Sequence, residues 1–254
     1  MQYGLINLAI VPLREKAAHS SQKVSQLLFG EGFTVLETEN GWLKIKTEND
    51  SYEGYIQATQ SVLVEENVYE KYLLKTVLLT YEPVTIISKK SDNSLLYLPA
   101  GSQIVGLENN EFVLGSTMFQ LQNQLQPKAN SLIDFANTYL NTPYLWGGRT
   151  HFGIDCSGFA QAVYRSQNIQ LKRDAWQQAE QGQIVDFLQA ALPGDLAFFD
   201  NEAGRIVHVG IMLNNEQIIH ASGNVKIDRI DDQGIYSAEQ KKYTHQLRII
   251  KRFF

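Results

Sequence analysis

The only cysteine of this 254-residue chain, Cys156, lies in the segment GGRTHFGIDCSGFAQAVY, residues 147–164. Asp155 precedes it, Ser157 and Gly158 follow it, and the residues after them recur with helical spacing. The first turn of a helix offers unpaired backbone N–H groups and a positive dipole end, which stabilise a thiolate. The position therefore suits a nucleophile, although a lone cysteine is more often a small buried apolar residue.

A thiol nucleophile needs a base, usually a histidine, and a third group that orients the base. Of the five histidines, His208 in IVHVGIML and His220 in IIHAS lie on two predicted strands joined by a short loop. The two rings share a face of the hairpin only if the loop has an odd length or a strand carries a bulge. Cys156 with two histidines is also a possible zinc set. Because no carboxylate or second cysteine stands at compact ligand spacing, we expect no metal and no cofactor.

The elements that must position these residues belong to two parts of the chain, which differ in their pattern of apolar and polar residues. Residues 1–125 alternate short apolar runs with turn signals such as Asn40-Gly41, and this pattern predicts all-β structure. We expect two small barrels in tandem, residues 1–65 and 66–125. A polar segment within residues 121–131 closes this part of the chain. Residues 126–254 read as helices followed by antiparallel strands, which predicts an α+β domain.

In that second part, three helices are expected. One begins after Ser131 as N-cap and stops before Pro143, one begins at Cys156, and one covers DAWQQAEQGQ and ends near Gly182. After these helices, apolar residues recur at every second position. This period predicts strands in DLAFFD, RIVHVGIMLNNEQIIHASG and HQLRIIKRFF.

Composition excludes several classes of protein. The net charge is −5, and no basic stretch indicates binding of nucleic acid. No run of about 18 apolar residues predicts a transmembrane helix, and the N-terminal apolar patch has no basic residues before it, so it reads as a strand and not as a signal peptide. One cysteine rules out an internal disulfide. We therefore expect a cytoplasmic protein with no membrane partner.

Four motifs in order, PYLWGG, DCSGF, HVGI and IIHASG, resemble the NlpC/P60 cysteine peptidase family over residues 126–254. The segment VPLREKAAHSSQKVSQLLFGEGFTVLETENGWLKIKTENDSYEGYI resembles a bacterial SH3-like (SH3b) domain. This arrangement is similar to the γ-D-glutamyl-L-diamino acid endopeptidases of the dipeptidyl-peptidase VI group. The resemblance implies a papain-like α+β domain that hydrolyses the γ-D-Glu–diamino acid bond of murein peptides such as L-Ala-γ-D-Glu-diamino acid.

The resemblance also implies roles for particular residues. Cys156 is the nucleophile, His208 the general base and His220 the group that orients it. Tyr144 is expected to bind the oxyanion. The remaining substrate-side positions are Asp155, Ser157, Arg173 and Asp174, together with Glu53 of the first SH3-like region, an acid that can hold the free N-terminal amine. The segment KRDAWQQA has Ala175 where some relatives have serine, so a hydroxyl contact there is lost or is replaced by backbone.

Two other readings remain open. SH3-like domains often bind cell wall, and an inactive NlpC/P60 domain makes a binding module. Acyl transfer or amidase chemistry is also possible on the same fold. The three intact residues Cys156, His208 and His220 favour an enzyme, and the SH3-like architecture favours the peptidase. The motifs do not decide whether the diamino acid of the substrate is meso-diaminopimelate or L-lysine.

Overall fold

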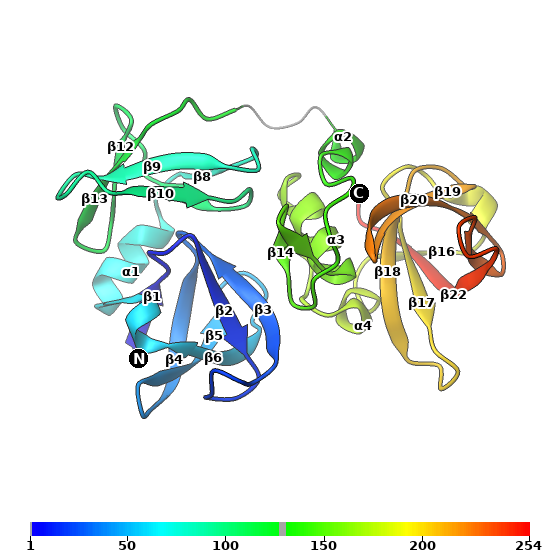
Figure 1. Ribbon diagram of the computed structural model, residues 1–254, viewed down its shortest axis with the longest axis horizontal. Coiled ribbons are helices and arrows are strands. Elements are labelled where there is room, and N and C mark those ends of the chain that lie inside the picture. The colour runs from blue at the N-terminus through cyan, green and yellow to red at the C-terminus, as the bar shows by residue number, and fades with distance from the viewer. Residues whose placement is uncertain (1, 127–130) are drawn as a thin grey trace. The chain divides into compact units, whose positions relative to one another are not determined.

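The computed structural model describes residues 2–126 and 131–254 and divides the chain into two compact units, Met1–Lys128 and Ala129–Phe254 (Figure 1). Each unit has buried apolar clusters of its own. Of the polar segment expected at residues 121–131, positions 127–130 lie outside the described residues.

The first unit opens with a seven-stranded antiparallel sheet in the order β3-β2-β6-β5-β4-β1-β7. A cluster of eight buried apolar side chains, among them Val11, Phe33 and Ile45, fills it. The predicted turn at Asn40 and Gly41 joins β4 to β5, and both residues take the positive φ that such a tight hairpin requires. The strands are β1 (Gln2–Leu5), β2 (Ile10–Arg14), β3 (Lys23–Leu28), β4 (Gly32–Glu39), β5 (Trp42–Thr47), β6 (Glu53–Gln57) and β7 (Val62–Val64), with a 3₁₀ turn η1 (Ala58–Gln60) before β7.

The second barrel expected at residues 66–125 is not confirmed. Helix α1 (Glu66–Leu73) opens this part, and the strands after it form a four-stranded sheet, β10-β9-β13-β12, and a separate pair, β11-β8. Leu5 of β1 and Phe29, which directly follows β3, share one buried cluster with these elements, so the second part does not have a core of its own. The β-structure predicted there is present. Its strands are β8 (Val77–Leu79), β9 (Thr85–Lys89), β10 (Leu95–Leu98), β11 (Gln103–Val105), β12 (Glu111–Leu114) and β13 (Thr117–Leu121).

The second unit begins with helices, as expected. In α2 (Leu132–Asn137), the hydroxyl of Ser131 caps the helix by accepting from the Asp134 amide at 3.0 Å. Strands β14 (Arg149–Thr150) and β15 (Gly153–Ile154) form a small hairpin before α3 (Cys156–Arg165). Helix α4 (Ala175–Gln178) is shorter than predicted, because the residues after it continue as tight turns up to Gly182, which has φ +70°.

The strands of the second unit close on themselves. The order is β16-β22-β17-β18-β19-β20-β21, and β21 also pairs with β22, so six strands form a ring (Figure 1). A buried apolar cluster that includes Phe199, Met212 and Ile250 lies among them, and α3 packs against β18 and β19. The strands are β16 (Gln183–Val185), β17 (Leu196–Asp200), β18 (Ile206–Met212), β19 (Gln217–Ser222), β20 (Asn224–Asp231), β21 (Gly234–Ser237) and β22 (Lys242–Arg252), with η2 (Leu188–Ala190) between β16 and β17.

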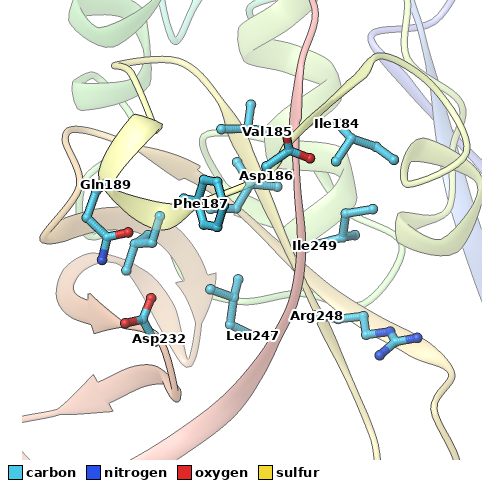
Figure 2. A pocket seen from close by; sticks show the side chains of 11 residues that line it. Ile184, Val185, Asp186, Phe187, Gln189, Asp232, Leu247, Arg248 and Ile249 are labelled. Atoms are coloured by element: carbon cyan, nitrogen blue, oxygen red, sulfur yellow. The ribbon is translucent and has the colours of Figure 1, made fainter.

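A pocket of about 360 Å³ lies beside β16, η2 and β22 (Figure 2). Phe187, Asp232 and Arg248 are among the residues that line it, and none of the predicted site residues does. Among the described residues, no helix has the length and apolar character that crossing a membrane requires.

Candidate active site

Cys156 is the first residue of α3, as the sequence predicts. Asp155 is the N-cap, and its Oδ1 accepts a hydrogen bond from the Gly158 backbone N–H at 2.7 Å. A carboxylate at this position satisfies one of the unpaired N–H groups of the first turn and stabilises the helix by about 0.5–2 kcal/mol. The cap therefore determines where the helix starts and, with it, where the thiol lies.

Gly158 lets this helix start approach the loop before it. A Cβ atom built on Gly158 would lie 2.3 Å from the carbonyl oxygen of Gly148, which is backbone and cannot move aside cheaply. The backbone of the helix start therefore lies close to the loop, and only glycine permits this approach.

The thiol is buried, with Cys156 only 7% exposed. Burial, followed by the charge of Asp155, raises the pKa of Cys156 to about 12, although hydrogen bonds from the backbone of Val209 and Ser157 and the charge of Arg173 act in the opposite direction. The lowered pKa expected for a helix N-terminus is therefore not found, because loss of solvation outweighs the backbone donors. The resting cysteine is a neutral thiol.

His208 and His220 meet on adjacent strands. Strand β18 pairs with β19 so that Gly210 opposes His220. Five residues lie between the last paired positions, Met212 and Ile218, and this odd number is the condition for the two rings to share a face. His208 Nε2 lies 2.9 Å from His220 Nδ1. The pairing of β17 with β18 skips Val207, and this bulge lies directly beside His208. Bulges commonly re-aim a side chain next to an active site.

The thiol lies beside this strand. Val209, whose backbone N–H bonds to the thiol of Cys156, directly follows His208. Burial lowers the pKa of His208 well below 6.5, and the neighbouring His220 and His245 lower it further. His208 is therefore neutral at neutral pH, and a neutral imidazole can accept the proton of a neutral thiol.

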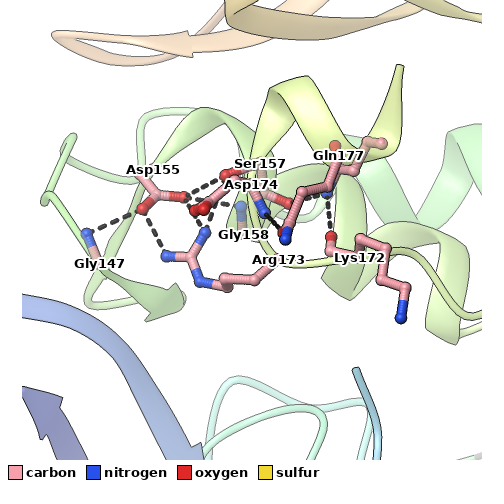
Figure 3. Close-up of polar contacts among 9 residues, drawn as sticks. Gly147, Asp155, Ser157, Gly158, Lys172, Arg173, Asp174 and Gln177 are labelled. Carbon is pink, nitrogen blue, oxygen red and sulfur yellow. Dashed lines mark hydrogen bonds and ion pairs between the residues drawn. The ribbon is translucent and has the colours of Figure 1, made fainter. Parts of the chain in front are cut away.

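Asp155 is also the centre of a buried polar network (Figure 3). Arg173, which is 1% exposed, donates to both of its oxygens, at 2.6 Å and 3.1 Å. The amide of Gly147 donates to Oδ2 at 2.8 Å, and Arg173 also reaches the hydroxyl of Ser157 at 2.8 Å. These bonds, with that from Gly158, occupy both carboxylate oxygens. In this structure Asp155 joins a loop, a helix start and a buried guanidinium.

Tyr144 and Asp174 complete the predicted set in this unit. Burial raises the pKa of the Tyr144 phenol, and the nearby Cys156 and Asp155 raise it further, so the hydroxyl remains a hydrogen-bond donor. Asp174 is the N-cap of α4 and forms a capping box with Gln177, whose Oε1 accepts from the Asp174 amide at 3.1 Å. A direct contact of either residue with substrate stays a prediction.

Known proteins are similar to this chain in sequence over both the SH3-like region and the region that holds these residues. Residues 141–248 match the NlpC/P60 family, and residues 13–60 match the bacterial dipeptidyl-peptidase Sh3 domain. The probable endopeptidase NlpC of Escherichia coli is 39% identical over 120 residues, which cover 46% of this chain and 76% of that protein. The chain belongs to the NlpC/P60 family. The resemblance inferred from the four motifs is thereby confirmed.

Two further relatives extend over both units. The gamma-D-glutamyl-L-lysine dipeptidyl-peptidase of Bacillus cereus is 27% identical over 227 residues, which cover 78% of this chain and 66% of that protein. The chain thus spans slightly less than two thirds of the length of that relative. A crystal structure of an NlpC/P60 family protein from Bacillus cereus superposes with a TM-score of 0.81, covering 98% of this chain and 99% of the other at 20% identity. This last match shows a shared fold.

Glu53 is the one predicted site residue outside the NlpC/P60 unit. It is exposed and is the first residue of β6 in the SH3-like sheet, where it lies opposite Lys46. Its expected contact with the substrate amine stays a prediction that rests on the resemblance of the first domain.

Two residues near the histidines were missed by the sequence analysis. His245 of β22 stacks on His208 with ring centroids 4.1 Å apart, and Asp228 of β20 lies 3.1 Å from His220 Nε2. The strict alternation in NVKIDRID after a tight turn places Asp228 on the same face as His220, a signal that was available. No comparable signal indicates His245, because the long-range pairing of β22 with β17 and β21 brings it there.

His208, His220 and His245 each offer a nitrogen within 4.8 Å of the others. Such a group is able to hold a metal ion in principle. In this NlpC/P60 unit, however, His208 Nε2 and His220 Nδ1 face each other at 2.9 Å. The second ring nitrogen of His220, Nε2, faces Asp228. These hydrogen bonds account for both nitrogens of His220.

Proposed function

We propose that this protein is a cysteine peptidase that hydrolyses the γ-D-Glu–diamino acid bond of murein peptides with a free N-terminal L-alanine. The observation that carries the proposal is the hydrogen bond from the Val209 amide to Cys156, beside a hydrogen-bonded pair of His208 and His220. A thiol, a base and an orienting group are the parts that nucleophilic amide hydrolysis requires.

The domain composition supports the choice of substrate. The SH3-like match is to a domain described for bacterial dipeptidyl-peptidases, and it occurs with an NlpC/P60 region in one chain. Two relatives that align with 78% of this chain, from Bacillus cereus and Bacillus subtilis, bear the name gamma-D-glutamyl-L-lysine dipeptidyl-peptidase. Murein peptides are the substrate class that these names indicate. Recycling of short peptides in the cytoplasm is part of the proposal.

Bond cleavage would proceed in two halves. Cys156 Sγ attacks the γ-carbonyl carbon of D-glutamate while the thiol proton passes to His208. The carbonyl oxygen becomes an oxyanion, for which the Tyr144 hydroxyl and the Cys156 backbone N–H are suitable donors. His208 then protonates the amine of the diamino acid as the C–N bond breaks, which leaves a thioester on Cys156.

The second half returns the enzyme to its resting state. Neutral His208 removes a proton from water, and the water oxygen attacks the thioester carbonyl. The tetrahedral intermediate collapses, the free γ-carboxyl of the L-Ala-D-Glu product forms, and the thiol recovers its proton. Starting from a neutral thiol and a neutral imidazole, proton transfer accompanies attack, because neither group is ionised beforehand.

Mass spectrometry of defined peptides tests this proposal. The purified protein should convert L-Ala-γ-D-Glu-L-Lys, or its meso-diaminopimelate counterpart, into L-Ala-D-Glu and the free diamino acid. The α-linked isomer should resist cleavage, and Cys156→Ala should abolish product formation. If the L-Ala-D-Glu acyl group is transferred to an added amine and not to water, the protein is a transferase. Binding of the peptides without turnover by the wild type would identify a binding module.

A further inference from the structure

The base His208 has two ring nitrogens, and only an unprotonated one can receive the thiol proton. A neutral imidazole carries one N–H and one acceptor nitrogen, and which nitrogen is protonated is set by the hydrogen bond that the other one makes. A fixed partner for the far nitrogen is therefore a requirement of the mechanism. His208 makes that bond through Nε2, which faces His220 Nδ1 at 2.9 Å.

The partner has the same ambiguity, because His220 is itself an imidazole. A histidine can donate or accept at Nδ1, so the pair alone allows two arrangements of protons. In one arrangement His208 Nε2 carries the proton and its Nδ1 is an acceptor. In the other, His220 donates to His208 Nε2, and the single proton of a neutral His208 occupies Nδ1, where it blocks acceptance from a thiol.

We propose that Asp228 is a positioning residue that selects the first arrangement by fixing the tautomer of His220 and, through it, that of His208. Asp228 Oδ2 lies 3.1 Å from His220 Nε2. A carboxylate can only accept, so His220 Nε2 carries a proton, and in a neutral His220 the Nδ1 atom must then accept. His208 Nε2 then donates to it, and His208 Nδ1 is left with a free electron pair. The inference rests on the proposed function, since it concerns the base of that reaction.

The surroundings of Asp228 keep its carboxylate in the form that this role requires. The hydrogen bond with His220 lowers the pKa of Asp228, and the charges of His220 and Lys226 lower it further. Lys226 Nζ lies 3.8 Å from the same carboxylate oxygen. The Asp228 side chain is 13% exposed, so it lies inside the structure without being sealed from water.

The strand register makes the arrangement a property of the fold. Strand β20 pairs with β19 so that Lys226 opposes His220 and Asp228 opposes Ile218. Asp228 is thus the diagonal neighbour of His220 on the same face, within reach of a side-chain contact. His245 of β22 covers the ring of His208 by stacking and bonds through Nδ1 to the Thr244 hydroxyl at 2.9 Å. It therefore limits the motion of His208 but does not select its tautomer.

The experiment combines kinetics with direct observation of tautomers. Asp228→Asn removes the charge and offers both an acceptor and a donor to His220, so both tautomers become possible. We expect kcat to fall about 10- to 100-fold with KM unchanged, less than the loss of about 10⁴-fold known for a carboxylate directly behind a catalytic histidine. Asp231→Asn on the same strand, where the carboxylate bonds to the exposed Tyr243, should retain wild-type kinetics.

Tautomers are read from the ¹⁵N shifts of the histidine side chains, which five histidines make tractable. The wild type should show His208 and His220 each protonated at Nε2, and Asp228→Asn and Asp228→Ala should each populate the Nδ1-protonated form of at least one ring. The proposal is overturned if kcat falls while both rings keep their wild-type tautomers, because the loss is then structural. It is also overturned if kcat stays within about twofold of the wild type. The tautomers are measured without substrate, so absence of peptidase activity in the wild type would refute the proposed function and leave this test of His220 and His208 in force.

Discussion

At the residue scale, the site combines a buried neutral thiol with a buried neutral imidazole. Burial is the dominant influence on both groups, and it raises the pKa of Cys156 and lowers that of His208. The two shifts oppose formation of a resting ion pair. In the proposed mechanism, catalysis then depends on orientation, since the proton must move from Cys156 to His208 as the bond to carbon forms.

Alanine substitutions should rank Cys156, His208 and His220 by how far each lowers kcat/KM. Cys156→Ala and His208→Ala should each lower kcat/KM by about 10³-fold or more, because nucleophile and base have no substitute. His220→Ala should lower it less, since water can replace part of an orienting bond. Steady-state kinetics on a murein tripeptide checks the order, with the circular dichroism spectrum as control for folding. Near wild-type activity in Cys156→Ala would refute the thiol mechanism.

The pH profile should show a base whose pKa is unusually low. His208 must be unprotonated to act, and burial, His220 and His245 hold its pKa well below 6.5. We therefore expect kcat/KM to rise with pH only in a limb below pH 6.5 and then to stay level, with no second rise near the ordinary thiol value of about 8.5. Burial lowers the pKa of His245 to about 4, so His245 becomes positive only at low pH. His245→Phe keeps a stacked ring and removes that low-pH charge, so it should move the limb to higher pH. If the limb of the pH profile does not move in this variant, it reports the titration of a group other than His208.

Metal ions should inhibit and should not activate. A chelator should leave the rate unchanged, because the proposed mechanism assigns no step to a metal. Zinc should lower it, since thiolate and imidazole are good ligands for this ion and three imidazoles converge within 4.8 Å. His245→Phe should weaken zinc inhibition. Loss of activity on dialysis against a chelator, with recovery on adding zinc, would reverse the assignment.

At the scale of elements, the start of α3 is held by the ion pair of Asp155 and Arg173. The pair is almost fully buried, with side chains 6% and 1% exposed and oxygen and nitrogen 2.6 Å apart. Removing one partner of a buried pair leaves a charge without compensation, which typically costs about 3–5 kcal/mol. The position of Cys156 depends on this pair through the cap at Gly158.

Arg173→Met should therefore lower both stability and kcat. We expect the free energy of unfolding to fall by about 3–5 kcal/mol. Lys44→Met, which breaks the exposed pair of Lys44 and Glu37 at 3.0 Å, should cost less than about 1 kcal/mol and leave activity unchanged. Urea denaturation of the variants measures the difference. Equal costs for the two substitutions would show that the buried pair does not hold the helix start.

At the scale of the whole molecule, the SH3-like unit raises the question of what it adds to the NlpC/P60 unit. A free N-terminal amine on the substrate needs an acid at a fixed distance from the thiol. Both oxygens of Asp155 are occupied by donors of its own unit, so a second acid is needed for this role. Glu53, exposed at the start of β6, is the residue that the resemblance names.

Glu53→Gln should raise KM about tenfold or more for a murein tripeptide with a free N-terminus, since a charged hydrogen bond contributes about 1.5–3 kcal/mol. The same variant should leave the slow cleavage of an N-acetylated peptide unchanged. Glu37→Gln on β4 of the same sheet is a matched control and should change neither value. If the wild type cleaves free and acetylated peptides equally well, selection of the amine is absent and the role of Glu53 is refuted.

The sequence alone was sufficient for the parts that depend on local chemistry. A cap, a glycine and a period of 3.6 placed Cys156 at the start of α3, and the alternation in IVHVGIML and IIHAS placed both histidines on strands. It also predicted strands within residues 66–125, but not how they assemble. Whether they form a second barrel depends on packing between distant segments, and Leu5 and Phe29 join them to the first sheet.

Tertiary structure decided the electrostatics and the neighbours of the site. A helix start favours a thiolate, yet the pKa of Cys156 is raised, because burial is a property of the whole unit and not of the motif. His245 reaches His208 through the pairing of β22 with β17 and with β21, which brings together positions 37 residues apart. Asp155 carries the charge that an ammonium ion needs, but the fold uses that charge to hold Arg173. Residue types and spacing thus determined which groups are present, and long-range pairing determined which of them touch and which remain charged.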